Sequence, residues 1–159
     1  MRPATAADHA AIRAVETAAF GRPDEADMVE AARAEGAALV ELVAEADGEI
    51  VGHILFSRMT VTPPRLIVGL APVAVSPGAQ SRGIGAELCR AGIAAARALG
   101  AEAVVVLGHP DYYPRFGFSA AAAAKLASPY AGSPAFMALE LAPGALGDPL
   151  RVDYPAAFG

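Results

Sequence analysis

The sequence has little of several residue types on which common protein functions depend. Among its 159 residues there is one cysteine, no tryptophan and a single lysine, Lys125. With Cys89 as the only cysteine, an intramolecular disulfide and the Cys-x-x-Cys spacing of structural zinc sites are both excluded. The formal charge of −5 argues against a nucleic-acid partner, because binding to a phosphate backbone relies on clustered Lys and Arg, and the arginines here are scattered.

Long hydrophobic runs are also missing. No apolar run approaches the roughly 18 to 20 residues that span a bilayer, and the N-terminus lacks a basic region followed by an apolar signal segment. We therefore expect a cytoplasmic protein that does not contact a membrane. The length suits one domain over residues 1–159, and the 55% hydrophobic content favours a globular fold.

Periodicity and turn signals predict two helices, an antiparallel hairpin, one β-loop-α-β crossover and further antiparallel strands. Asp47-Gly48 indicates the hairpin turn, while Gly69 and Pro72 indicate a bulge. The fully apolar strand 103–107 should lie parallel to the strand 66–75, which gives an α/β (α+β) protein with a mixed sheet and helices on its faces. Helices are expected at 5–21, 24–36, 83–99 and, briefly, 111–116, and strands at 39–46, 50–61, 66–75, 103–107, 135–141 and 150–154.

The most informative stretch is the corner from Val73 to Ala86, where an apolar strand turns into a helix through Gly83 and Gly85. Glycines let a ligand approach the backbone, and the first turn of a helix presents unpaired N–H groups and the positive end of its dipole. This corner therefore predicts an anion site, with phosphate as the expected guest. Neither the Walker pattern nor G-x-G-x-x-G fits, which makes kinase and dehydrogenase chemistry poor matches.

Two sequence motifs indicate which anion the corner binds. Gln80-Ser81-Arg82-Gly83-Ile84-Gly85 matches Q/R-x-x-G-x-G/A, and Tyr113-Pro114-Arg115-Phe116-Gly117-Phe118 matches Y-x-x-x-G-F. In this order, separated by one amphipathic helix and one strand, they make the chain resemble the GNAT superfamily of acyl-coenzyme A-dependent N-acyltransferases. The sequence around the second motif, together with the closing segment V-D-Y-P-A-A-F, resembles a bacterial subgroup of this family whose substrates are mostly unassigned.

The resemblance implies a fold and a donor. The fold is a central mixed, mostly antiparallel sheet of six to seven strands with about four flanking helices, splayed between the strands 66–75 and 103–107. The acyl donor is acetyl-CoA, and no metal is implied. The strand edge should pair with the pantetheine amides, while the loop amides hold the pyrophosphate. The implied cofactor-binding residues are Val73, Ala74, Val75, Gln80, Ser81, Arg82, Gly83, Ile84, Gly85 and Ala86.

Acyl transfer from a thioester to an amine needs a neutral amine, a stabilised oxyanion and a proton for the departing thiolate. Tyr113 is the candidate acid because of its register with the G-F pair, although the neighbouring Tyr112 could be the reactive residue. An unpaired backbone N–H in the bulged strand near Val73 to Val75 is the candidate oxyanion donor. The base is open. His109, His53 and Glu41 are candidates, with water or no protein base as alternatives.

The sequence therefore predicts an acetyl-CoA-dependent N-acetyltransferase that acts by direct attack in a ternary complex. The acceptor would be a primary amine of a small molecule or a peptide, and its identity stays open. Exposed edge strands are compatible with a homodimer. The alternative is an acyl-CoA-binding sensor or assembly subunit without catalysis, because residues 69–75 lack a carboxylate.

Overall fold

A six-stranded sheet forms the centre of the computed structural model, which describes residues Met1–Gly159. The strand order is β1-β2-β3-β5-β6-β8, and every neighbouring pair is antiparallel except the parallel pair β5–β6. The predicted mixed, mostly antiparallel sheet is confirmed. The strands of this sheet are β1 (Arg2–Pro3), β2 (Ala38–Ala46), β3 (Glu49–Arg58), β5 (Ile67–Val75), β6 (Ala103–Leu107) and β8 (Phe136–Glu140).

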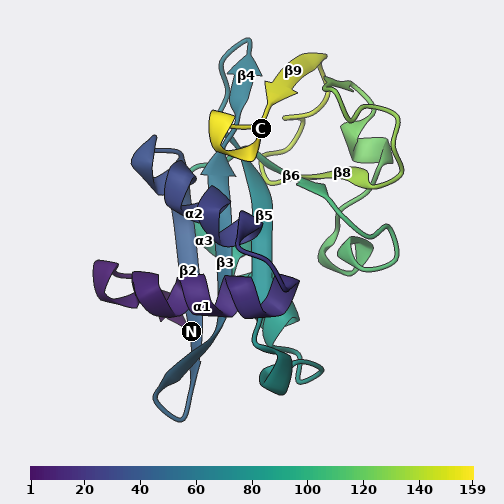
Figure 1. Cartoon of the computed structure of the whole chain (residues 1–159). Helices are drawn as coiled ribbons and strands as arrows, with labels where there is room; N and C mark the ends of the chain where they lie inside the picture. The colour runs from purple at the N-terminus through teal and green to yellow at the C-terminus, as the bar shows by residue number, and fades with distance from the viewer.

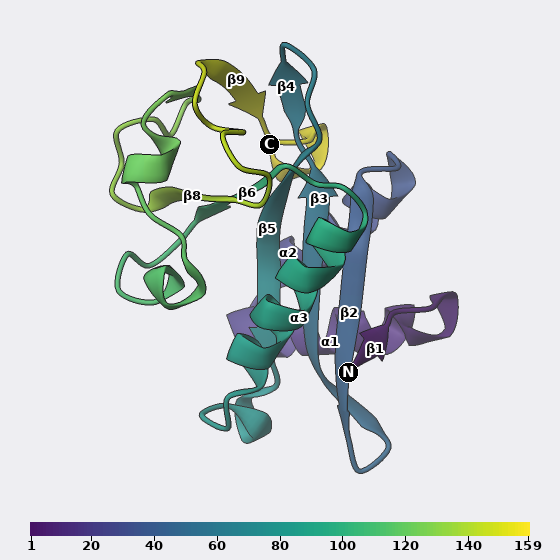
Figure 2. The same ribbon diagram turned by 180° about the vertical axis from the view of Figure 1, so that it is seen from behind.

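Helices cover both faces of the sheet. The helices α1 (His9–Phe20) and α2 (Asp24–Ala34) lie on one face, and α3 (Ile84–Ala98) lies on the other (Figures 1 and 2). Side chains alternate across a strand, so Ile54 and Phe56 pack toward α3 while His53 and Leu55 face α1 and α2. About four helices were expected. The structure has three α-helices and five short 3₁₀ helices, because the segment around residue 113 forms only the 3₁₀ helix η3 (Tyr113–Phe116).

The two turns that the sequence indicated are present. Asp47 and Gly48 have φ values of 53° and 77°, the left-handed values of a tight hairpin turn, and they join β2 to β3. In β5, the register against β3 passes from Leu70 opposite Phe56 to Val73 opposite Ile54, so β5 carries one extra residue at Ala71-Pro72. The predicted bulge is confirmed.

A second, three-stranded sheet was not expected. The strand predicted over 50–61 breaks at Met59, and the residues beyond it form β4 (Thr60–Thr62). This strand pairs with β9 (Leu150–Asp153), which also pairs in parallel with β7 (Leu126–Ala127). The last predicted strand therefore exists but belongs to the small sheet. A buried apolar cluster fills the space between the small sheet and the β5, β6 and β8 strands.

The strands β5 and β6 separate along their length. They pair only from Ile67–Gly69 to Ala103–Val105, so the rest of β5 has no neighbour on that side. Figure 1 shows β6 and β8 leaving the plane of the other strands, with the green loops that flank β8 beyond them (Figure 1). The predicted splay is confirmed, and it leaves a strand edge open in the middle of a sheet. None of the α-helices has the length and the apolar composition that a membrane crossing requires.

Candidate active site

The open edge of β5 presents backbone groups at alternate residues. The N–H of Ser76 donates to the carbonyl of Val51 at 2.8 Å, which fixes the hydrogen-bonding phase of the β3–β5 pair. In an antiparallel pair, successive residues alternate between facing the partner strand and facing away from it. Val75 and Val73 therefore direct their N–H and C=O groups away from β3, into the gap between the separated strands β5 and β6. Ala74 does the opposite. Its backbone faces β3 opposite His53, so of the three predicted strand residues only Val73, with both backbone groups, and Val75, with its N–H, can bond a ligand.

The loop after β5 holds a run of unpaired donors. No backbone N–H from Gln80 to Ala86 donates a hydrogen bond to the protein, and the first donor of α3 is Glu87, which bonds the carbonyl of Gly83 at 3.0 Å. Ser81 and Gly83 have φ values of 65° and 80°, so the loop turns twice through the left-handed region just before the helix. Consecutive free N–H groups at a helix N-terminus form an anion site that needs no particular side chain.

Side chains in this loop support the backbone more than they add charge. The Nε2 of Gln80 donates to the carbonyl of Val75 at 3.0 Å, which ties the loop back to the strand. Arg82 is exposed and forms no ion pair, so it is free to reach a ligand or solvent. A Cβ at Gly85 would meet only ordinary contacts, with Val75 Cγ2 and the Tyr112 hydroxyl oxygen at 3.7 Å each, so glycine here leaves space rather than relieving a clash.

A cavity of about 390 Å³ lies between the loop and η3. Arg115 of the second motif and Tyr112, which directly precedes that motif, close its far side. The guanidinium of Arg115 lies 4.2 Å from the centre of the Tyr112 ring, and its Nε donates to the Tyr112 carbonyl at 2.8 Å. Sequence reasoning assigned no role to Arg115, although a basic residue inside the tyrosine motif was a usable signal. Together with the helix N-terminus, it makes the cavity favourable for an anion.

The two adjacent tyrosines occupy different environments. Tyr113 is only 9% exposed, and its ring packs edge to face against Phe118 with centroids 5.9 Å apart. Burial raises the pKa of Tyr113 well above its usual range, and its hydroxyl has no hydrogen-bond partner in the protein. Tyr112 lines the cavity instead, and burial also raises its pKa. Both phenols therefore keep their proton at neutral pH, as a general acid requires.

The candidate bases are placed very differently. His109 is exposed in the loop after β6. His53 is fully buried, and both of its ring nitrogens face carboxylates: Nδ1 lies 2.6 Å from Glu16 Oε2 and Nε2 lies 2.8 Å from Glu41 Oε2. Burial alone would lower the pKa of His53, but the two carboxylates outweigh burial and raise it. With no free nitrogen, His53 cannot take a proton from an amine directly.

Glu41 is engaged as well. It accepts hydrogen bonds from His53 and from Arg33, whose Nε lies 3.1 Å from Glu41 Oε1. Burial raises the pKa of Glu41, but the two cationic donors outweigh burial and hold it at about 2. A carboxylate this weakly basic is a poor proton acceptor near neutral pH. The sequence did not identify Glu16, the third member of this group. Its one signal was a charged residue four positions after Ile12, on the apolar face of the first helix.

Comparison with known proteins agrees with this geometry. The profile of the acetyltransferase (GNAT) family matches residues 9–118. The uncharacterized N-acetyltransferase YjhQ of Escherichia coli K12 is 44% identical over 124 residues, which cover 74% of this chain and 68% of that protein. The uncharacterized N-acetyltransferase YhbS of the same strain is 36% identical over 117 residues, which cover 72% of this chain and 70% of that protein.

Two solved structures share the whole fold. The crystal structure of YhbS from Escherichia coli in complex with CoA superposes with a TM-score of 0.91 at 34% identity, over 99% of this chain and 89% of that one. A GNAT family acetyltransferase from Brucella melitensis in complex with acetyl-CoA gives a TM-score of 0.82 at 37% identity, over 99% of this chain and 96% of that one. The splayed strands, the loop of free amides and the matched relatives together show that this chain belongs to the GNAT family of acetyltransferases.

Proposed function

We propose that this chain transfers an acetyl group from acetyl-CoA to a primary amine of a small-molecule or peptide acceptor. The observation that carries the proposal is the run of unpaired backbone N–H groups from Gln80 to Ala86, which begins where the open edge of β5 ends. A diphosphate bound to these amides would leave the pantetheine arm beside the free backbone groups of Val73 and the free N–H of Val75. The complexes of YhbS with CoA and of the Brucella protein with acetyl-CoA support the same donor here.

The reaction that fits this arrangement is direct attack in a ternary complex. The open β5 edge would align the thioester, and a free N–H of the bulged strand would stabilise the oxyanion. Tyr113 would give its proton to the thiolate as the C–S bond breaks. Because β4, from the middle of the chain, pairs with β9 near the C-terminus, we also propose that residues 1–159 form one N-acyltransferase domain.

Thiol release from acetyl-CoA tests the activity. The protein would be offered amino acids, a polyamine, an aminoglycoside and peptides with free N-termini, and we expect at least one to accelerate thiol release. The alternative function, an acyl-CoA sensor without catalysis, is favoured by one observation: β5 carries no carboxylate that could serve as a base. Tight binding of acetyl-CoA with no turnover of any amine would establish the sensor instead.

The loop assignment is tested with Gly83→Val. At a φ of +80° a side chain is strained by roughly 1–2 kcal/mol, and its bulk would enter the site where the diphosphate is expected. Gly36→Val is a matched control, because Gly36 has a φ of +75°, equally open surroundings and a position away from the cavity. We expect similar losses of stability in both variants and a loss of acetyl-CoA affinity, by calorimetry, only at Gly83. Equal acetyl-CoA affinities of the two variants would show that the loop is only a turn and does not bind the diphosphate.

The acid is tested by the pair Tyr113→Phe and Tyr112→Phe. Each variant removes one hydroxyl and keeps the ring, so packing in this aromatic group is retained. We expect kcat to fall about 100-fold or more for Tyr113→Phe, as for the loss of a general acid. If only Tyr112→Phe lowers kcat, the acid is the cavity-lining tyrosine.

A further inference from the structure

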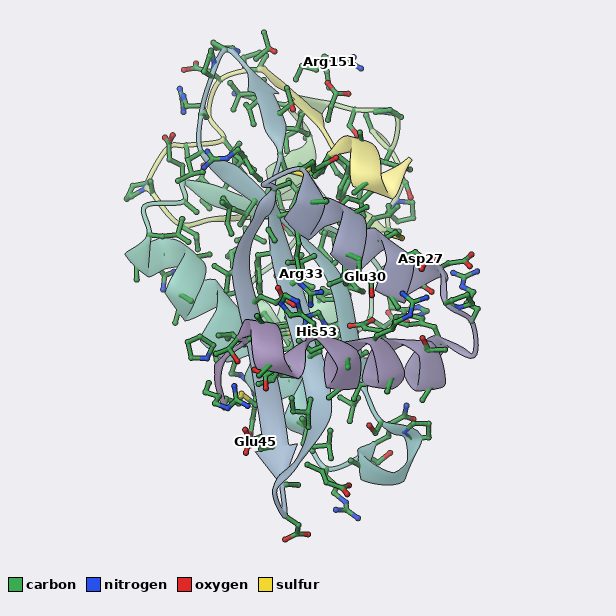
Figure 3. All side chains as sticks on the ribbon, turned by 60° about the vertical axis from the view of Figure 1, so that its left-hand side comes forward. Asp27, Glu30, Arg33, Glu45, His53 and Arg151 are labelled. Carbon is green, nitrogen blue, oxygen red and sulfur yellow. The ribbon has the colours of Figure 1, made fainter.

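Four ionisable side chains meet beneath α1 and α2, outside the cofactor gap. Glu16 comes from α1, Arg33 from α2, Glu41 from β2 and His53 from β3. In Figure 3 the labelled residues His53 and Arg33 lie near each other where the two helices cover the sheet, and both bond Glu41 (Figure 3). Glu16 and His53 are fully buried, and the other two are largely so.

The two carboxylates of this group accept different numbers of hydrogen bonds. Glu41 receives hydrogen bonds from both His53 and Arg33, so its charge is fully compensated. Glu16 receives only the bond from His53 Nδ1 at 2.6 Å, and its second oxygen, Oε1, has no partner in the protein. A buried carboxylate oxygen without a partner is strongly unfavourable, so it calls for a functional explanation. His53 fixes Glu16 in place, and the other carboxylate oxygen is buried without a donor.

The group lies one strand away from the proposed thioester. His53 is the cross-strand partner of Ala74, and Ala74 stands between Val73 and Val75, which face the gap. Helix α1 packs against both β3 and β5. Because neighbouring strands are about 4.8 Å apart, only one strand spacing separates β3, whose His53 holds Glu16, from β5, and hydrogen-bonded water would have to connect the carboxyl to the open edge.

We propose that Glu16 is the general base of the acetyl transfer, taking the proton of the acceptor ammonium on Oε1 through water, and that His53 is the residue that positions it. The inference rests on the proposed acetyltransferase function. It supplies the base that β5 lacks, and it places the acceptor on the α1 and α2 face of the sheet, opposite α3 and Tyr113.

The proton and electron transfers balance as follows. The ammonium gives one proton through water to Glu16, and the freed nitrogen lone pair forms a bond to the thioester carbonyl carbon. The C–S bond breaks with its electron pair on sulfur, and the thiolate takes the proton of Tyr113. The second proton lost from nitrogen returns to the tyrosinate, the third remains as the amide N–H, and Glu16 releases its proton to solvent.

The charges around Glu16 suit this role. Burial raises the pKa of Glu16, the bond from His53 opposes this, and the nearby carboxylates of Glu25 and Glu41 raise the pKa further. Arg33 binds Glu41 rather than Glu16, so it does not neutralise the base. A carboxyl group with a raised pKa is a better proton acceptor near neutral pH than an ordinary one.

The test is Glu16→Gln, assayed by thiol release with the most active amine of the panel. Glutamine keeps the shape and the contact with His53 but cannot take the proton. We expect kcat to fall about 100-fold or more, the ascending limb of the pH profile of kcat to disappear, and acetyl-CoA affinity to stay unchanged. Glu102→Gln is the control, since Glu102 is partly buried, is paired with Arg65 and lies outside this group, and its kcat should stay within about twofold of wild type.

His53→Asn gives an independent readout. Loss of the bond from His53 should raise the pKa of Glu16, so the ascending limb should move to higher pH, which a purely structural role would not cause. An unchanged limb in both the Glu16 and the His53 variant, whatever their thermal stability, overturns the proposal. A wild-type protein that binds acetyl-CoA but turns over no amine overturns the acetyltransferase function itself, so the two failures are distinguishable.

Discussion

Gly108, the first residue after β6, is predicted to hold Tyr113 in its reactive position. A Cβ added at Gly108 would lie 2.3 Å from Cε2 and 2.9 Å from Cδ2 of the Tyr113 ring, whereas ordinary contacts begin at 3.4 Å. The change Gly108→Ala therefore requires the ring to move by about 1 Å. On its other side the ring packs against Phe116 and Phe118, so it cannot shift without strain.

Two magnitudes follow from this shift. Overpacking a filled core by one methyl group costs about 1–3 kcal/mol of unfolding free energy. In a protein of this size each kcal/mol lowers the Tm by roughly 2–4 °C, so Gly108→Ala should still be folded at 25 °C. A displacement of about 1 Å in a reacting group can lower the rate about 100-fold, so kcat should fall by that order while acetyl-CoA affinity is retained.

The assay is thiol release at saturating acetyl-CoA, with calorimetry of acetyl-CoA binding and a thermal melt of each variant. Gly78→Ala is the control, because a Cβ at Gly78 would meet nothing within 4 Å. It should leave kcat unchanged. A Gly108→Ala variant with the kcat of wild type would refute the reasoning, since the position of the Tyr113 hydroxyl would then not matter to the reaction.

Local patterns in the sequence were sufficient to predict the strand, loop and helix that form the proposed cofactor site. The strand 66–75 was expected within one residue of β5 (Ile67–Val75), and the glycine corner appears as predicted with Gly83 in the left-handed region. Strand edge, loop and helix N-terminus are contiguous in the chain, so their geometry is set by nearby residues. The sequence did not reveal that Ala74 faces away from the gap, because that depends on its hydrogen-bonding phase against β3.

The small second sheet and the pairing of Glu16 with His53 depend on contacts between segments that are distant in the sequence. The break at Met59 and the pairing of β4 with β9 join residues about 90 positions apart, and a continuous apolar run gives no sign of them. The meeting of Glu16 with His53 is of the same kind. Each of the two residues sits alone in an apolar pattern, and only the packing of α1 on β3 brings them together.

Two further predictions concern buried ionisable groups. Burial raises the pKa of the Cys89 thiol to about 12, so we expect iodoacetamide at pH 8 to leave the folded protein unmodified and fully active. The unfolded chain should react once, and mass spectrometry measures both outcomes. Rapid modification of the native protein would show that this part of α3 opens to solvent. The second prediction concerns acid stability. The pKa of Glu41 is about 2 in the folded protein against 4.5 for an ordinary Glu, so in the acid range the unfolded chain binds more protons than the folded one. The stabilisation by this carboxylate is therefore present above pH 4.5 and is lost as the pH falls toward 2. We expect the Tm to fall steeply below about pH 4.5, and we expect Glu41→Gln, though less stable at pH 7, to lose less Tm over that range. Parallel pH profiles of Tm for wild type and Glu41→Gln would mean that His53 and Arg33 do not hold this carboxylate in its charged form.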